Sequence, residues 1–417
     1  MTYVYKLGGT SQCITGYDKL ISVLAGSKNI NFIVLSAVSG VTNNLIKFTE
    51  TKDFQFITKA IDLNKKLISE LNLNSLYFNK IKDKLIDLAK KYSESFDMSD
   101  VYVKSEIIGF GEVMSTNIFY MYLDSKGIKN KQILNSYDYI FSTKEIYQCN
   151  SQTEFYCDKK INLFFESFEE TDNIYILQGF IGSTPSGKKI ILGRGGSDTT
   201  GALVAKAIYA KTYEVWTDVD GIYTADPRIF KNSFQVKNID YNLCQELSAM
   251  GAKVMHPLSI KPCADVNIPI IVRNTFSDSE GTIISNEKTN ETFYAIQKSQ
   301  TVFKIKSLDM WNSYGFITDI FRRFSENRID INIVTTSQFS ISATTSEINI
   351  YKLKEIRDIL SEKYEVEMIN ECTIFSIVKK NIKDILLNSL ELKIQLKTQL
   401  RILRNKISLI LGLSVRC

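Results

Sequence analysis

The feature of this sequence that most constrains its fold is a repeated pattern of a short apolar segment, a loop of small residues and a stretch with helical period. The pattern appears first at residues 2–11 (TYVYKLGGTS) and again at residues 29–45 (NINFIVLSAVSGVTNNL). Apolar segments at residues 173–183, 213–223 and 268–276 are also separated by sequence of helical period. Alternation of buried strands with helices is typical of α/β domains. It predicts an α/β domain with a mainly parallel sheet.

From about residue 300 the pattern changes to shorter segments. Residues 301–310, 315–330, 331–345, 347–352 and 353–368 read as strand, helix, strand, strand and helix, and residues 372–378 add a further strand. This order predicts a smaller α+β unit with the element order βαββαβ. We therefore expect one domain over residues 1–295 and a second over residues 300–370, while residues 371–417 begin a second unit of the same kind and diverge into a basic tail.

Length and composition narrow the class of protein. A chain of 417 residues with 44% hydrophobic and 23% charged residues is typical of a globular protein with two or three domains. No apolar run is long enough to span a bilayer, and the first residues lack a secretion signal, so we expect a cytoplasmic protein that binds no membrane. A net charge of +5 does not indicate nucleic-acid binding.

Cysteine and histidine usage argues against a disulfide framework or a zinc site. The seven cysteines include no CxxC pair, and His256 is the only histidine of the chain. We therefore expect no metal site made of protein ligands. We interpret His256 as a structural residue of the turn at residues 253–257 (KVMHP).

Four loops of small residues follow predicted strand ends, at residues 8–11, 36–42, 179–183 and 192–200. The carboxyl ends of parallel strands meet at one edge of a sheet, where α/β folds bind ligands. The last loop, LGRGGSDTT, lacks the lysine of GxxxxGK[ST] and carries Asp198 in place of the third glycine of GxGxxG. A generic phosphate-binding loop is therefore excluded at this position.

Arg194 and Asp198 stand four residues apart at this predicted helix start. An arginine can hold a carboxylate in two parallel hydrogen bonds, while an aspartate can hold an ammonium group. Together the two side chains suit a zwitterion, which indicates an amino-acid ligand. The alternative is an ion pair that only caps the helix.

Several segments in a fixed order resemble the aspartate kinase family of the amino-acid kinase fold. They are KLGGTS (6–11), LSAVSGVTNNL (35–45), GFGEVMST (109–116), LGRGGSDTTGALVA (192–205), WTDVDGIYTADPR (216–228) and MGAKVMHP (250–257), and the resemblance covers residues 1 to about 378. It implies a three-layer α/β domain followed by an ACT regulatory region. It also implies that ATP phosphorylates the side-chain carboxylate of L-aspartate to 4-phospho-L-aspartate, the first step towards lysine, threonine and methionine. A homodimer or higher homo-oligomer is expected.

The resemblance also assigns roles to individual residues. The transfer site comprises Lys6, Gly8, Gly9 and Asp198; the aspartate site comprises Ser36, Thr42, Glu112, Arg194 and Ser197; the ATP site comprises Thr217, Asp218, Tyr223, Arg228 and Lys253. Mg²⁺ is expected to accompany ATP, whose phosphate oxygens supply most of its ligands. The chemistry agrees with a chain that has one histidine, because a carboxylate is already ionised at neutral pH and needs no general base.

The ACT resemblance implies an effector site that binds an amino acid such as lysine or threonine. Its candidate contacts are Met310, Ser313, Gly315, Phe316 and Asn332. Asn332 stands where lysine-sensitive members carry aspartate, and the loss of that negative charge argues against lysine recognition. Competing interpretations are a non-catalytic amino-acid sensor, or a kinase of the same fold acting on glutamate, acetylglutamate or a nucleotide. The length argues against a fused homoserine dehydrogenase.

The last 39 residues, 379–417, depart from the family pattern. They contain nine Lys and Arg residues against two acidic residues, and no Phe, Tyr or Trp. Two interpretations stay open: an amphipathic helical extension, or a slip of reading frame near residue 379 that replaces the rest of a second ACT domain.

Overall fold

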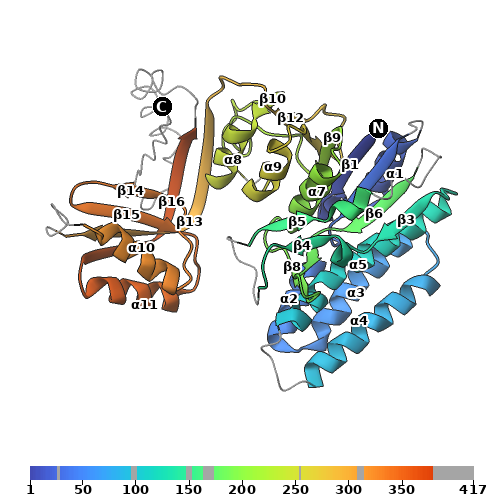
Figure 1. Cartoon of the computed structure of the whole chain (residues 1–417), viewed down its shortest axis with the longest axis horizontal. Coiled ribbons are helices and arrows are strands. Elements are labelled where there is room, and N and C mark those ends of the chain that lie inside the picture. The colour runs from blue at the N-terminus through green and yellow to red at the C-terminus, as the bar shows by residue number, and fades with distance from the viewer. Residues whose placement is uncertain are drawn as a thin grey trace. The chain divides into compact units, whose positions relative to one another are not determined.

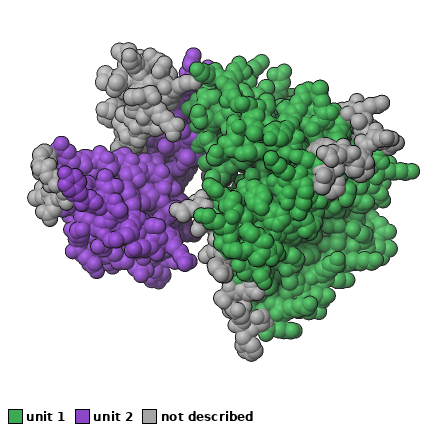
Figure 2. Space-filling model, in the orientation of Figure 1, with its two compact units in different colours: residues 1–222, 235–245, 254–289 green, residues 223–234, 246–253, 290–417 purple. Residues whose placement is uncertain are grey.

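The computed structural model describes residues 1–25, 29–94, 101–146, 153–162, 173–252, 255–307 and 314–378. The chain forms two compact units, which Figure 2 shows in different colours. Unit 1 comprises residues 1–222, 235–245 and 254–289, and unit 2 comprises residues 223–234, 246–253 and 290–417. The chain therefore passes from one unit to the other more than once. The tail at residues 379–417 lies outside the described residues.

Unit 1 is built on an eight-stranded sheet with the strand order β10-β12-β11-β9-β1-β2-β6-β3 (Figure 1). Its strands are β1 (Thr2–Leu7), β2 (Ile30–Leu35), β3 (Lys131–Leu134), β6 (Ile174–Gln178), β9 (Thr212–Thr217), β10 (Asn238–Asp240), β11 (Ile270–Asn274) and β12 (Thr282–Ser285). Neighbouring strands are parallel except β11 and β12. The predicted mainly parallel sheet is confirmed, and the loops after β1, β2, β6 and β9 lie at one edge.

Helices cover both faces of this sheet. One face carries α1 (Ile14–Leu24), α2 (Val41–Thr51), α3 (Phe54–Glu70), α4 (Leu76–Glu94) and α5 (Val101–Ser125), which share one apolar cluster with Tyr5 and Leu7 of β1. Side chains alternate along a strand, so Lys6 points to the opposite face. There α7 (Gly196–Ala207) packs with α9 (Pro257–Ala264). Among the described helices, none combines the length and hydrophobicity that crossing a membrane requires.

The remaining elements of unit 1 lead into the loops of interest. A four-stranded sheet of order β5-β4-β7-β8 comprises β4 (Ile140–Ser142), β5 (Phe155–Cys157), β7 (Ile181–Ser183) and β8 (Lys189–Ile191). Single 3₁₀ turns are η1 (Gly9–Ser11), η2 (Ser136–Asp138) and η3 (Lys159–Asn162). Helix α8 (Tyr241–Ala249) follows β10; its residues up to 245 belong to unit 1 and the rest to unit 2. Strands β7 and β8 form an antiparallel pair, and residues 192–195 connect β8 directly to α7.

Unit 2 contains a four-stranded antiparallel sheet of order β14-β15-β13-β16. Its elements are β13 (Phe293–Lys306), α10 (Phe316–Glu326), β14 (Val334–Thr336), β15 (Ser340–Thr345), α11 (Ile350–Ser361) and β16 (Glu365–Val378). The predicted order βαββαβ is confirmed. Its apolar core joins Phe303 of β13 to Phe324 of α10 and Ile356 of α11.

One predicted element of unit 2 is wrong. Residues 347–352 were expected as a strand, but α11 begins at Ile350. The Asn349 side chain accepts hydrogen bonds from the backbone N–H groups of Tyr351 and Lys352, at 3.1 and 3.3 Å. This cap satisfies two of the amides that a helix start leaves unpaired, so it favours a helix over the alternating apolar pattern. Residues 331–345 form two strands, β14 and β15, rather than one.

An aromatic cluster joins distant segments within unit 2. Phe230 stacks on Tyr294 of β13 at 6.2 Å between ring centroids, and Tyr294 stacks on Phe375 of β16 at 5.9 Å. The backbone N–H of Tyr294 also donates to the carbonyl of Thr224 at 2.8 Å. Residues 223–234, which belong to unit 2, thus pack against the start of β13 and the end of β16.

In the same unit, the carboxylate of Asp319 on α10 is surrounded by three cationic side chains and a tyrosine hydroxyl. Its carboxylate accepts from the Tyr364 hydroxyl at 2.9 Å and lies 3.0 Å from Arg322, 3.5 Å from Arg323 and 3.3 Å from Lys363. The hydrogen bond from Tyr364, followed by these cations, lowers the pKa of Asp319 from 3.8 to about 2. Its stabilising contribution is therefore present above about pH 3.8 and is lost as the pH falls towards 2.

Replacing Asp319 with asparagine is accordingly expected to lower the melting temperature at pH 7 by about 2–4 °C. The difference in urea midpoint from wild type should shrink as the pH falls from about 3.8 towards 2, where Asp319 itself becomes protonated. The matched control is Asp358→Asn on α11, whose carboxylate pairs on the surface with its neighbour Arg357 at 2.6 Å. An equal loss of stability in both variants would contradict the special role of Asp319.

Candidate functional site

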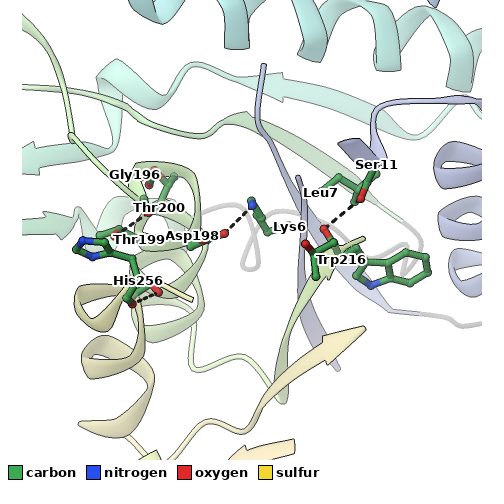
Figure 3. A network of polar contacts seen from close by, with 12 residues as sticks. Lys6, Leu7, Ser11, Gly196, Asp198, Thr199, Thr200, Trp216 and His256 are labelled. Atoms are coloured by element: carbon green, nitrogen blue, oxygen red, sulfur yellow. Dashed lines mark hydrogen bonds and ion pairs between the residues drawn. The ribbon is translucent and has the colours of Figure 1, made fainter. Parts of the chain in front are cut away.

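Lys6, near the end of β1, provides a cation at the carboxyl edge of the large sheet. The residue is 8% exposed, and its Nζ lies 2.6 Å from Oδ1 of Asp198 in the first turn of α7 (Figure 3). A buried ion pair adds little net stability, because removing both charges from water costs about as much as their attraction returns. The Lys6–Asp198 ion pair is therefore better explained by a role in ligand binding than by a contribution to the stability of the fold.

The glycines after β1 let two strand-end loops touch. The N–H of Gly8 donates to the carbonyl of Trp216 at 3.0 Å, which ties this loop to the end of β9. A Cβ atom at Gly9 would come within 2.8 Å of the Ala37 carbonyl oxygen, in the loop after β2. Only glycine fits there without displacing backbone. The two loops thus form one continuous backbone surface beside Lys6.

The loop before α7 depends on two left-handed glycines. Gly193 has φ of 81° and Gly195 has φ of 69°, a region that residues with a side chain rarely adopt. Between them the Arg194 side chain is exposed. Gly195 is the N-cap residue of α7, and among the described residues no side chain caps the start of this helix. The alternative that Arg194 and Asp198 form a capping pair does not describe the structure, because the ion pair of Asp198 is with Lys6.

The first turn of α7 is fixed from two sides. The Thr200 hydroxyl accepts from the N–H of Phe180 at 3.1 Å, and the Tyr213 hydroxyl donates to the Asp198 carbonyl at 2.9 Å. A Cβ atom at Gly179 would lie 2.5 Å from the Cβ of Ser197, so the loop after β6 packs directly on that serine. These contacts hold Asp198 opposite Lys6.

Glu112 on α5 places a second carboxylate near this edge. It is 3% exposed, and its Oε1 accepts from the N–H of Ala37 at 3.1 Å. Among the described residues its Oε2 has no hydrogen-bond partner. Burial raises the pKa of Glu112 to about 8, although the Ala37 N–H and the charge of Lys6 act in the opposite direction. A buried carboxylate oxygen without a partner is costly unless a ligand supplies a donor.

Two further residues predicted for substrate binding, Ser36 and Thr42, lie after β2 and at the start of α2. The N–H of Ser36 donates to the Leu7 carbonyl at 3.1 Å, and the Ser36 carbonyl accepts from the Ser115 hydroxyl on α5 at 2.8 Å. Thr42 is half-buried in the first turn of α2. A chain of contacts thus links the loops after β1, β2 and β6 with α5 and α7, the elements that carry the predicted transfer and aspartate sites.

The residues predicted for ATP are divided between the two units. Thr217 ends β9 and Asp218 follows it in unit 1, and their side-chain oxygens are 3.2 Å apart. Tyr223 and Arg228 belong to unit 2, where Arg228 donates to both carboxylate oxygens of Asp226 at 2.9 and 2.8 Å. Lys253 lies outside the described residues. The assignment of these residues to ATP stays a prediction.

Comparison with known proteins decides the family. The profile of the amino acid kinase family matches residues 1–274. This chain belongs to the amino acid kinase family. Within it, the chain is 27% identical over 357 residues to lysine-sensitive aspartokinase 3 of Escherichia coli (strain K12), covering 82% of this chain and 77% of that protein. It is 28% identical over 396 residues to chloroplastic aspartokinase 1 of Arabidopsis thaliana, covering 91% and 69%.

Solved structures of amino acid kinases agree with this placement. Crystal structures of E. coli aspartokinase III match with TM-scores of 0.73 for the complex with aspartate and ADP (R-state) and 0.72 for the complex with lysine and aspartate (T-state). Both are 25% identical; the first covers 89% of this chain and 86% of that one, the second 88% and 85%. The predicted resemblance to aspartate kinases and the predicted fold class are confirmed.

The effector residues predicted for this amino acid kinase are only partly described. Met310 and Ser313 lie outside the described residues. Gly315 is the N-cap residue of α10 with φ of 85°, and Phe316 is its first helical residue. Asn332 donates through Nδ2 to the Gln300 side chain at 2.7 Å. Gly315 and Asn332 are exposed, and their role in effector binding stays a prediction.

Sequence reasoning missed residues that build this amino acid kinase site through the backbone. Ala37 contributes its N–H to Glu112, and its methyl side chain carries no chemical signal. Gly179 was noted only as part of a loop, although its contact with Ser197 locates α7. Among the described residues, no group of three His, Cys, Asp or Glu side chains could hold a metal ion.

Proposed function

We propose that this chain transfers the γ-phosphoryl group of ATP to the side-chain carboxylate of L-aspartate, giving 4-phospho-L-aspartate and ADP. The observation that carries the proposal is the buried, unpartnered carboxylate oxygen of Glu112 near the Lys6–Asp198 ion pair. The carboxylate of Glu112 suits an ammonium ion, and the ammonium group of Lys6 suits a phosphate. The complexes of E. coli aspartokinase III with aspartate, ADP and lysine support this assignment.

Recognition of aspartate would use both charges of its amino-acid end. The ammonium group would bind Oε2 of Glu112, which becomes ionised when a cation is supplied. The exposed guanidinium of Arg194 would hold the α-carboxylate in two parallel hydrogen bonds. Ser36, Thr42 and Ser197 would add neutral hydrogen bonds. The side-chain carboxylate would then be directed towards Lys6.

Phosphoryl transfer needs alignment and charge neutralisation rather than a base. A carboxylate oxygen of aspartate attacks the γ-phosphorus while the bond to the β–γ bridging oxygen breaks, and ADP leaves with that electron pair. Lys6 would offset the negative charge on the transferring group, with Gly8 and Gly9 allowing close backbone approach. Asp198 holds the ammonium of Lys6 in place from 2.6 Å.

ATP would enter as its magnesium complex. The phosphate oxygens and water can supply the ligands of Mg²⁺. Thr217, Asp218, Tyr223, Arg228 and Lys253 are proposed for the nucleotide. We assign catalysis to residues 1–295 and regulation to an ACT unit over residues 300–370, with residues 371–417 beginning a second one. The oligomer is proposed to be a homodimer or larger.

One assay tests the proposed activity. The protein is incubated with ATP, Mg²⁺, aspartate and hydroxylamine, which converts an acyl phosphate into a coloured hydroxamate. We expect aspartyl hydroxamate together with stoichiometric ADP. Turnover of glutamate, acetylglutamate or a nucleotide in place of aspartate would overturn the proposal, and aspartate binding without ADP formation would indicate a sensor. Addition of lysine, threonine or methionine to the same assay identifies the effector.

The raised pKa of Glu112 predicts how aspartate binding depends on pH. Since burial raises that pKa to about 8, the free protein holds Glu112 mostly protonated at pH 7, and binding of the ammonium group must expel the proton. The affinity for aspartate should rise by up to about tenfold per pH unit below pH 8 and level off above it. Titration calorimetry in two buffers of different ionisation enthalpy measures the released proton.

Two variants on α5 complete this prediction. Glu112→Gln should bind aspartate weakly and without proton release. Glu106→Gln removes a partly exposed carboxylate of the same helix that pairs with Lys189, and it should behave as wild type. Proton release that persists in Glu112→Gln would assign the titration to another group.

A further inference from the structure

His256 occupies the N-cap position of α9, next to the loop that carries Arg194. Its Nδ1 accepts from the N–H of Leu258 at 3.4 Å, and its carbonyl accepts from the N–H and hydroxyl of Ser259 at 2.9 and 2.6 Å. The residue is half-buried. As an acceptor, Nδ1 requires an imidazole that is not doubly protonated. The cap therefore exists only while His256 is neutral.

The same residue determines how closely α9 approaches the loop before α7. A Cβ atom at Gly195 would lie 2.3 Å from Cβ and 2.6 Å from Cγ of His256, so the histidine packs directly on this left-handed glycine. Figure 3 shows His256 beside Thr199 in the first turn of α7. Gly195 lies between Arg194 and the turn that carries Asp198. A shift of His256 would thus move both residues.

The burial of the imidazole favours its neutral form near pH 7. Burial is the main cause that lowers the pKa of His256 below 6.5; the charge of Asp198 opposes this, and that of Arg194 adds to it. The other charged groups of α7 and α9 are Lys206 and Lys261, and each pairs with Asp265, the C-cap residue of α9, at 2.6 and 2.7 Å. Protonation would place a second cation beside Arg194 and remove the acceptor for the N–H of Leu258.

We propose that His256 is a positioning residue of the aspartate site: its neutral imidazole holds the Gly193–Gly195 loop in the form that presents Arg194, and its protonation weakens aspartate binding. This inference rests on the proposed function. It extends the interpretation of His256 as a structural residue of a turn, because it assigns the cap a consequence for substrate affinity. His256 touches no reacting atom in this scheme.

The test compares His256→Asn and His256→Ala with wild type from pH 5.5 to pH 8. Asparagine caps a helix as well as any residue but does not titrate. At pH 8, His256→Ala should raise the aspartate KM roughly three- to tenfold with little change in kcat or in the ATP KM, whereas His256→Asn should stay within about twofold of wild type. Below pH 6.5 the wild-type aspartate KM should rise more steeply than that of His256→Asn.

The comparison between variants isolates the histidine, because the titrations of Glu112 and of ATP are common to all of them. The control is Asp53→Ala, which removes the cap of α3 in the same unit and should lower stability without changing the aspartate KM. An equally steep rise of the aspartate KM below pH 6.5 in wild type and His256→Asn would overturn the inference. An unchanged aspartate KM in a folded His256→Ala protein would also overturn it. Absence of hydroxamate with wild type would instead overturn the proposed function, while calorimetric titration of aspartate would still report on His256.

Discussion

Replacing Lys6 with methionine is expected to lower kcat for aspartate phosphorylation by roughly 10²–10³-fold, the usual cost of removing one placed electrostatic stabiliser. Methionine keeps much of the length of the side chain but carries no charge. The change leaves Asp198 without the cation that now lies 2.6 Å away, so an uncompensated negative charge would face the incoming polyphosphate. Hydroxamate formation under saturating ATP and aspartate measures the loss.

A matched lysine tests whether this effect is specific. Lys126, at the end of α5, pairs with Asp18 at 3.0 Å on the surface of the same unit. Lys126→Met should retain wild-type kcat. Near-normal turnover in a folded Lys6→Met protein would show that another cation neutralises the transferring group, and circular dichroism establishes that the variant is folded.

Replacing Arg194 with alanine should raise the aspartate KM roughly ten- to a hundredfold, the effect expected when charge-assisted hydrogen bonds to a carboxylate are lost. Arg194 is exposed in a loop whose shape comes from glycines, so the substitution should leave the fold intact. ATP binding, followed by fluorescence of a nucleotide analogue, should be unchanged.

Arg194→Lys separates charge from geometry at the same position. Lysine retains the positive charge but cannot form two parallel hydrogen bonds, so its aspartate KM should lie between those of wild type and Arg194→Ala. Equal weakening of aspartate and ATP in Arg194→Ala would mean that the arginine serves the nucleotide, and the proposed assignment of the loop would be wrong.

Much of unit 1 could be predicted from the sequence because loops of small residues follow β1, β2 and β6. Lys6, Gly8 and Gly9 were predicted at a strand end, and they lie at the carboxyl edge of β1. The ion partner of Asp198 was not foreseen. Sequence spacing pointed to Arg194, one helical turn away, whereas the structure pairs Asp198 with Lys6 on a distant strand. Local spacing carries no information on which strand a helix start will face.

Residues 347–352 show a different limit of sequence reasoning. Their apolar residues alternate, which is typical of a strand, yet the segment starts helix α11 because Asn349 pairs two unsatisfied backbone amides. The sequence contains both signals: Asn349 is a residue type that caps helices, and the apolar residues alternate as in a strand. Packing decided between them, since Leu353, Ile356 and Leu360 recur with helical spacing and are buried in the core of unit 2.

The aromatic cluster of Phe230, Tyr294 and Phe375 has a practical consequence for truncation. A recombinant fragment that stops at residue 295 would keep Phe230 and Tyr294 but discard the ring of Phe375 and the whole of β16, which pairs with the start of β13. Residues 223–234 would then expose to water the apolar surface that packs against Phe375 in the full chain. Production of a catalytic piece by simple truncation is therefore a poor route to a soluble enzyme, and deletion after residue 378 preserves every described partner of this segment.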